Sequence, residues 1–418
     1  MMKYLSFAIL ISLLFSAKGM AAQTVEVCVT CEYSSVKMAV ENARPGATIL
    51  IKSGIYKEHN IFITKPLTLI GEKNAVIDGE EKGEIIRVQA NNVTIDGLTL
   101  INVGTSFTTD YAALRIVKSE NFLLRNLTLK NLFFGIYLEK SNNGKVLNNT
   151  IMGDAVNEYN SGNGIQLWYS KNIEVAGNTV RKVRDGIYLE FSDEINIHHN
   201  KSLDNLRYGL HFMFSNNDVY SHNLFENNGA GVAVMFSKFI KMESNIFRKN
   251  WGTASFGLLL KEINDAEITG NLFEENTVGI HLEGGNRINY QHNDFKSNGW
   301  AVKVRGACYA NVFRFNNFLH NSFDISYNSN LNDNKFDQNY WSNYTGYDLN
   351  KNGVGDVTYR PVKLFSYVVN RTPETIILLR SLFIDIIDFS EKVSPVFTPD
   401  NLMDHNPLLK PVDHDSYR

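Results

Sequence analysis

The chain has 418 residues, 44% of them hydrophobic, and a formal net charge of −3 from 41 basic and 44 acidic residues. A chain of this length can bury a large core. Charges of both signs are mixed along it without a basic stripe, so nucleic acid is not expected as a partner.

The first 22 residues have the pattern of a secretory signal peptide. Lys3 precedes an apolar run over residues 4–15, and small residues follow up to Ala21 and Ala22. The run is too short and wrongly flanked for a stable membrane span. We therefore expect cleavage near Ala21 or Ala22, a mature protein outside the cytoplasm, and membrane contact through a partner only.

Two of the three cysteines follow directly, as Cys28-Val-Thr-Cys31. A compartment outside the cytoplasm permits disulfides, so a short-range disulfide is one interpretation. The same spacing can bind a soft metal, and a metal-transfer pair is the alternative. The third, Cys308, is expected to be a buried small residue.

Residues 34–43 predict a short helix, and β-patterned segments follow it as an N-terminal cap and first coils. From residue 113 the chain then repeats, mostly every 22 or 23 residues, through stretches such as GIYLEFS, GLHFMFS and GVAVMFS. Asparagine recurs in register with these stretches, at Asn149, Asn178, Asn200, Asn223, Asn245, Asn271 and Asn293.

A β-patterned unit of this length cannot bury its apolar face alone. Coiling stacks each strand on its equivalent one turn away, at roughly 4.8 Å, so that asparagine side chains can form hydrogen-bonded ladders. A leucine-rich horseshoe would need a leucine consensus and a helical return, and the sequence has neither. We predict a right-handed parallel β-helix over residues 23–346.

The outward face of this coil changes character at residues 211–235. The first and third residues after each leading position are apolar and should face the core, while the second and fourth should face outward. Most outward residues are polar, but here His211 and Met213 lie beside Met235 of the next repeat. Sulfurs ~4.8 Å apart can both reach one ion at ~2.3 Å, and thioether and imidazole donors without carboxylate suit Cu(I). We predict a copper site at His211, Met213 and Met235; a hydrophobic contact patch is the alternative.

His199 and His222, one repeat apart, form a weaker candidate metal pair, because histidines next to turns commonly form hydrogen bonds with backbone groups.

Two insertions, at 152–163 and 251–255, fall at one corner of the coil and should flank the copper patch. Loops that bracket a site are where partners are commonly found.

Residues 347–360 contain a possible calcium loop, with oxygen-bearing side chains on alternate residues at Asp348, Asn350, Asn352 and Asp356. A plain Asn/Gly turn is the alternative.

The last segment, 361–418, combines a predicted helix over 375–392 with an extended tail. Arg380, Asp385 and Asp388 keep that helix from spanning a bilayer, and it could either cap the open end of the coil or dock onto another protein.

The GLHFMFSNN stretch, the NYWSNYTGYDLNKNGVGDVTYRPV segment, and the tail motifs LLRSLFIDIIDFSEK and DHNPLL together resemble the NosD family. These are periplasmic β-helix accessory proteins of nitrous oxide reductase maturation, and the resemblance covers nearly the whole mature chain. It implies a periplasmic, non-enzymatic protein that works with an ABC-type permease and ATPase. It further implies that the protein takes copper from a lipoprotein chaperone and passes it to the reductase. In this way it would help to assemble the copper–sulfide centre of the reductase. The calcium loop departs from the most acidic family versions at Asn350 and Asn352.

Two other classes of function stay open. A polysaccharide lyase or epimerase would use the same coil, but needs acidic residues on adjacent outward rungs together with a basic residue. The outward carboxylates Glu139, Glu190 and Glu283 are never on adjacent rungs. A structural or glycan-binding solenoid would bind no metal.

Overall fold

The structure is a computed structural model that describes residues 23–106, 108–328, 333–379, 381–393, 402–414 and 417. The predicted signal peptide, with its cleavage position, lies outside the described residues, as does Arg380.

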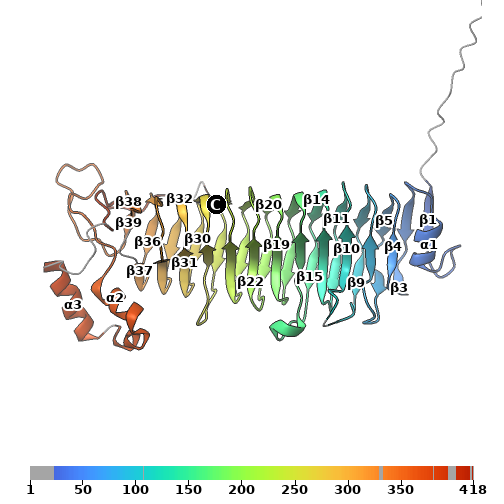
Figure 1. Ribbon diagram of the computed structural model, residues 1–418, viewed down its shortest axis with the longest axis horizontal. Coiled ribbons are helices and arrows are strands. Elements are labelled where there is room, and N and C mark those ends of the chain that lie inside the picture. Colours follow the sequence, from blue (N-terminus) through green and yellow to red (C-terminus); the bar gives the residue numbers. More distant parts are fainter. Residues whose placement is uncertain are drawn as a thin grey trace, which may run out of the picture.

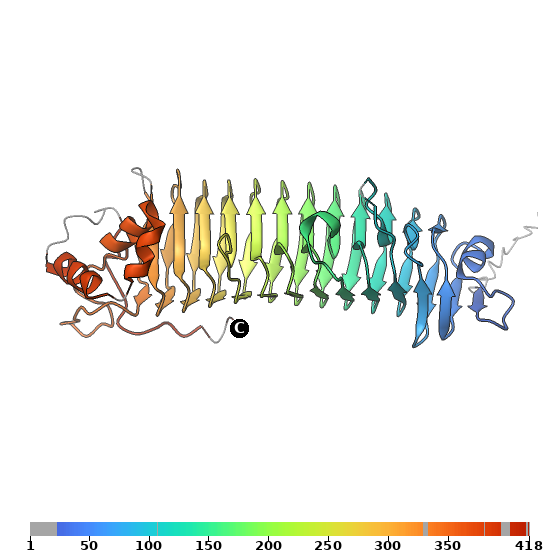
Figure 2. The ribbon, with the colours of Figure 1, turned by 90° about the horizontal axis from the view of Figure 1, so that it is seen from below.

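The described chain winds into a long rod in which each strand lies beside its equivalents one turn before and after (Figures 1 and 2). All strand pairs are parallel, and three sheets of 14, 13 and 12 strands run along the rod in the described residues. We call them sheets I, II and III, in the order in which each turn of the coil visits them, and we call one such turn a rung. The predicted right-handed parallel β-helix is confirmed.

Sheet I contains β1 (Thr24–Val27), β2 (Thr48–Ile51), β5 (Thr68–Gly71), β8 (Thr94–Asp96), β11 (Leu123–Arg125), β14 (Asn142–Leu147), β17 (Lys171–Ala176), β20 (Asp193–His198), β23 (Val219–Ser221), β26 (Lys241–Glu243), β29 (Asn264–Thr269), β32 (Asn286–Gln291), β35 (Val312–Arg314) and β38 (Lys335–Asp337). Sheet II contains β3 (Gly54–Lys57), β6 (Ala75–Asp78), β9 (Thr99–Ile101), β12 (Thr128–Lys130), β15 (Thr150–Met152), β18 (Thr179–Arg181), β21 (Lys201–Leu203), β24 (Leu224–Glu226), β27 (Ile246–Arg248), β30 (Leu272–Glu274), β33 (Asp294–Lys296), β36 (Asn317–Leu319) and β39 (Tyr340–Trp341). Sheet III contains β4 (Ile61–Ile63), β7 (Ile86–Val88), β10 (Ala112–Val117), β13 (Phe134–Glu139), β16 (Ile165–Trp168), β19 (Asp185–Glu190), β22 (Tyr208–Met213), β25 (Ala230–Met235), β28 (Leu258–Lys261), β31 (Val278–Glu283), β34 (Trp300–Arg305) and β37 (Phe323–Tyr327).

The core is a column of stacked apolar side chains inside the coil. In β22, Leu210 and Phe212 point inward and are fully buried, as the alternation of the sequence predicts. Phe225, Phe247 and Phe273 stack on successive rungs, with ring centroids 5.5 and 4.6 Å apart. Identical residues thus meet because the repeat length matches one turn of the coil.

The predicted asparagine ladders are present and buried. Asn200 Nδ2 donates to Asn223 Oδ1 at 3.0 Å, and Asn223 Nδ2 donates to Asn245 Oδ1 at the same distance. Asn223 Nδ2 also donates to the carbonyl of Ile197 at 3.0 Å. Each asparagine therefore satisfies backbone groups at a corner where the strands cannot.

A helix covers the N-terminal end of the coil. Helix α1 (Val36–Asn42) is shorter than the predicted 34–43 because Ser35 is its N-cap and accepts from Met38 N at 3.2 Å. Glu58, which directly follows β3, accepts from Val36 N and Lys37 N and so satisfies two further free amides of the first turn.

The other end carries α2 (Leu364–Arg371), the 3₁₀ segment η2 (Pro373–Leu378) and α3 (Leu382–Val393). The prediction of one uninterrupted helix over 375–392 is wrong, because the backbone at Leu379 is not helical (ψ 130°) and divides the run. Helix α2 was not predicted. A small apolar cluster fixes these helices against the outer face of sheet III; its members are Val278, Trp300, Phe323, Phe365, Val369 and Ile384.

The tail beyond these helices returns along the coil (Figure 2). Asp404 is fully buried and accepts from Asn339 Nδ2 at 3.1 Å and from Trp341 Nε1 at 3.0 Å, so it occupies the next position of the asparagine ladder. His414 lies against Asp294, with Nδ1 2.9 Å from Oδ1. The described part of the tail therefore packs on its own coil.

Candidate metal site

Strands β22 and β25 bring the three predicted copper ligands together on the outer face of sheet III. Met213 is paired in register with Met235, and His211 with Ala233. His211 and Met213 lie on the same face because they are two residues apart in one strand. Both methionines are half-buried.

The histidine is less open than predicted. His211 is only 6% exposed, because the rings of Tyr188 and Tyr208 flank it with centroids 4.8 Å away. Neither of its ring nitrogens has a hydrogen-bond partner among the described residues. An imidazole that is buried with both nitrogens unpaired loses free energy unless something binds it.

A buried ion pair that sequence reasoning missed lies directly beside this imidazole. Asp185 is fully buried, and it accepts from Arg207 Nε at 2.8 Å and also contacts Arg207 Nη2. Its Oδ2 lies 3.7 Å from His211 Nδ1. Burial raises the pKa of Asp185, but the hydrogen-bonded Arg207 guanidinium and the nearby His211 ring outweigh burial and leave the pKa below its usual value. The alternation of the sequence does not signal this contact, because residue 185 precedes the counted positions and has the parity of the core-facing Ile187 and Leu189.

A carboxylate also adjoins the methionines, contrary to the predicted carboxylate-free donor set. Glu190 is paired in register with Met213, so Glu190, Met213 and Met235 form one column. Beside this column, at the corner toward sheet I, exposed aromatic rings stack with centroids 4.7, 5.2 and 5.1 Å apart; they are Tyr169, Phe191, Phe214 and Phe236.

The two insertions flank the patch as predicted. The first contains the short η1 helix (Glu158–Asn160) and leads into β16, and the second leads into β28. Strands β19, β22 and β25 lie between these two in sheet III.

The second candidate pair is a histidine stack. His199 and His222 lie parallel with centroids 5.0 Å apart. His198 Nδ1 lies 3.0 Å from His199 Nδ1, and its Nε2 lies 3.2 Å from Glu174 Oε1. No group of three or more His, Cys, Asp or Glu residues within the described ranges is placed to hold a metal ion. Metal binding here stays a secondary prediction.

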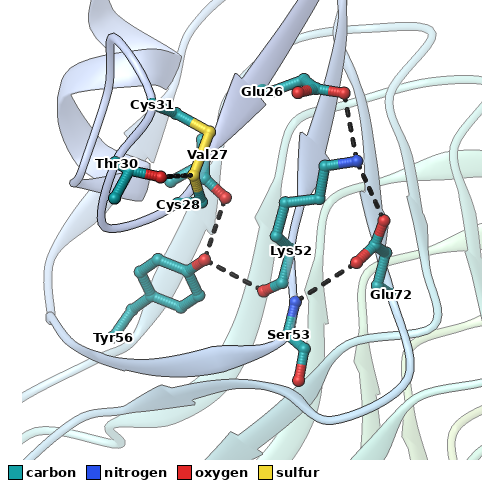
Figure 3. The surroundings of a disulfide bond; sticks show 9 residues. All are labelled: Glu26, Val27, Cys28, Thr30, Cys31, Lys52, Ser53, Tyr56 and Glu72. Carbon is teal, nitrogen blue, oxygen red and sulfur yellow. Dashed lines mark hydrogen bonds and ion pairs between the residues drawn. A yellow bond between two sulfur atoms is a disulfide. The ribbon is translucent and has the colours of Figure 1, made fainter.

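Cys28 and Cys31 are joined in a disulfide (Figure 3). Next to them the Tyr56 hydroxyl donates to the carbonyls of Val27 and Lys52, each at 2.9 Å. This state favours the disulfide interpretation over the metal-transfer pair, because neither sulfur is then a thiolate. Cys308 is free and buried, as expected.

The predicted calcium loop is closed by its own hydrogen bonds. Asp348 Oδ2 accepts from Gly353 N at 2.8 Å, Asn352 Oδ1 from Val354 N at 2.8 Å, and Asp356 Oδ2 from Leu349 N at 2.6 Å. Gly353 has a φ of 86°, which favours glycine at this turn. These bonds fit the plain Asn/Gly turn, and calcium binding by this loop stays a prediction.

Comparison with known sequences finds similarity to NosD proteins. A family model described as "Periplasmic copper-binding protein (NosD)" matches residues 147–346. A protein of Pseudomonas aeruginosa named "Probable ABC transporter binding protein NosD" is 28% identical over 402 residues, covering 84% of this chain and 86% of that protein. A protein of the same name from Stutzerimonas stutzeri is 27% identical over 368 residues, covering 83% and 84%.

Comparison with solved structures shows the fold alone. The alginate lyase AlyF-OU02 in complex with G6 is similar with a TM-score of 0.59 and 15% identity, covering 80% of this chain and 88% of the lyase. A family 28 exopolygalacturonase of Yersinia enterocolitica has a TM-score of 0.56 and 11% identity, covering 76% and 78%. No helix in the described residues is long and apolar enough to cross a membrane.

Proposed function

We propose that this chain, which is similar to NosD proteins over most of its length, is a periplasmic copper carrier of that family. It binds one Cu(I) transiently at His211, Met213 and Met235 and hands it over during assembly of the copper–sulfide centre of nitrous oxide reductase. A copper-chaperone lipoprotein is the donor.

The observation that carries this proposal is the unpaired imidazole beside two thioethers in register. His211 is buried and neither ring nitrogen makes a hydrogen bond within the described chain, so the ring can donate to a metal ion, and Met213 and Met235 supply soft sulfur on adjacent rungs. Soft donors favour Cu(I) over harder ions. Thioethers take up no proton at neutral pH, so they bind copper without proton competition.

We do not expect burial of a histidine on this face to be sufficient for copper binding, and His281 illustrates why. It occupies the equivalent position of its own rung and is also 6% exposed, but Glu283 replaces the methionine two residues later. Burial, together with the charges of Arg305 and Lys303, lowers the pKa of His281 to about 4. Positive charge beside His281 opposes cation binding, whereas a carboxylate lies beside His211.

The terminal helix α3 supplies the surface for the ABC-type permease and its ATPase. Ile384 of α3 packs against the α2 cluster, while the opposite face of α3 leaves large apolar side chains exposed; these are Leu382, Phe383, Ile386 and Phe389. Exposed apolar faces of this kind mark interaction sites. Membrane contact then occurs through the permease.

We further propose that the protein is a carrier and not a catalyst. The outward carboxylates Glu139 and Glu190 are separated by Trp168, with which both are in register. Asp185, which lies beside His211, is closed off from solvent. A lyase or epimerase would need its acid and base groups open to a saccharide.

The experiment is a competition titration of Cu(I) against a chelating dye, for the wild type and for His211→Ala, Met213→Leu and Met235→Leu. Loss of a group that only orients a ligand costs about 10–100-fold in metal affinity, so loss of a ligand should cost at least about tenfold. The three losses should be non-additive because they act on one ion. Leucine keeps the volume of methionine, so the fold should be retained.

His281→Ala is the matched control, because it removes an equally buried histidine from the same face without methionine neighbours. It should leave copper affinity unchanged. If all five proteins bind copper alike, the patch is an interface and the ion binds elsewhere, with His199 and His222 the next candidates.

A further inference from the structure

Asp185 is placed to act on His211 and not only on Arg207. Both oxygens of the carboxylate contact Arg207, yet Oδ2 also lies 3.7 Å from His211 Nδ1. The backbone amide of Tyr208 donates to Oδ1 at 3.3 Å, which leaves the carboxylate fixed between two rungs. Burying a charged carboxylate is costly unless it is paired, so the full burial of Asp185 indicates a specific role.

The position equivalent to Asp185 in the His281 rung holds an apolar ring. Asp185 begins β19, the strand next to that of His211, and Phe256 holds the corresponding place before β28, the strand next to that of His281. The centroids of the Phe256 and His281 rings are 4.8 Å apart. Of these two buried histidines, therefore, only the one with methionine neighbours has a carboxylate at this position.

We propose that Asp185 is the positioning residue of the copper site. Its carboxylate holds the proton of His211 on Nδ1 and so leaves the Nε2 lone pair free for Cu(I). Carboxylates commonly hold metal-binding histidines in this way, because they fix both the tautomer and the orientation of the ring. Closing the 3.7 Å separation by about 0.7 Å would give an ordinary hydrogen bond. This inference rests on the proposed copper function.

Asp185→Asn tests it. The amide side chain of this variant could still accept from Arg207, but it would present an N–H to His211 Nδ1 and so favour the proton on Nε2, the wrong tautomer for binding. We expect the dissociation constant for Cu(I) to rise by about 10–100-fold. We also expect ¹⁵N NMR of the copper-free protein to show the His211 proton moving from Nδ1 to Nε2, which a purely structural role of Asp185 would not cause.

Arg207→Lys separates positioning from stability. It keeps the positive charge and the carboxylate but loses the planar fork, so the melting temperature should fall while the tautomer is kept and copper affinity stays within about threefold. If Asp185→Asn changes neither the tautomer nor the affinity while Met213→Leu weakens binding, the positioning role is overturned and the copper function stands. If Met213→Leu has no effect either, both fail. If Arg207→Lys weakens copper binding as much as Asp185→Asn with the tautomer unchanged, the pair is structural only.

Discussion

The buried carboxyl group of Asp218 should make the coil less stable as pH rises, and its replacement by asparagine should remove that effect. Asp218 is fully buried at the corner before β23, where Oδ1 accepts from Ile195 N at 2.8 Å. Its Oδ2 has no hydrogen-bond partner in the described part of the chain. Asn311 occupies the equivalent corner before β35 and shows what an amide does there: it accepts from Ile288 N at 3.0 Å and donates to the carbonyl of Gly285 at 2.9 Å.

The direction in which stability changes with pH follows from the pKa of Asp218. Burial raises the pKa of Asp218 well above its usual value, and the nearby charges of Asp193 and Glu194 raise it further. The folded chain therefore binds this proton more tightly than the unfolded chain, whose aspartate pKa is about 3.9. The contribution to stability is fully present below the unfolded pKa and is lost as pH rises toward the folded pKa.

The size of the expected stabilisation follows from the unpaired Oδ2 of Asp218. A buried polar atom without a partner costs about 1–3 kcal/mol, and a hydrogen bond to a carbonyl adds about 0.5–1.5 kcal/mol. Asp218→Asn should therefore stabilise the protein by about 1–3 kcal/mol at pH 7, with a smaller gain at pH 5.

Thermal melts by circular dichroism at pH 5, 6, 7 and 8 measure this. The matched control is Asn311→Asp, which places a carboxyl group at the equivalent corner and should lower the melting temperature, more so at pH 8 than at pH 5. If Asp218→Asn melts below the wild type, or if the two melt in parallel across the whole range, Asp218 is not a buried neutral carboxyl and the argument fails.

Three further outcomes are expected. Asn223→Ala should lower stability by about 3 kcal/mol or more, because it leaves ladder amides and a carbonyl unpaired; an unchanged melting temperature would contradict the ladder's role. Asp404→Ala should loosen the C-terminal rungs and shift the emission of the buried Trp341 to the red, since it removes the acceptor of the indole N–H; unshifted emission would mean that the tail does not close the coil. The double variant Phe383→Ser/Phe389→Ser should keep the wild-type melting temperature but no longer co-purify with the permease, because both side chains are exposed; retention of the complex would remove α3 as the docking surface.

The periodicity of the sequence is sufficient to predict the coil and part of the site. Side chains in a strand alternate between two faces, and a repeat of constant length places equivalent residues one strand spacing apart. The stacking of Met213 on Met235 and the ladder from Asn200 to Asn245 therefore follow from the spacing of residues along the chain. The insertions at one corner follow from the same count.

Tertiary structure decided what periodicity does not encode. The burial of His211 depends on how the rings of Tyr188 and Tyr208 turn toward it, and the approach of Asp185 depends on a residue outside the repeated positions. The contact of Asp404 with Asn339 joins residues 65 apart in the chain. Such a contact does not recur from rung to rung, so no local sequence pattern predicts it. It must also offset the entropy of closing a long loop. Repetition fixed the backbone and its register, whereas the accessibility of the metal site was set by side chains that occur only once.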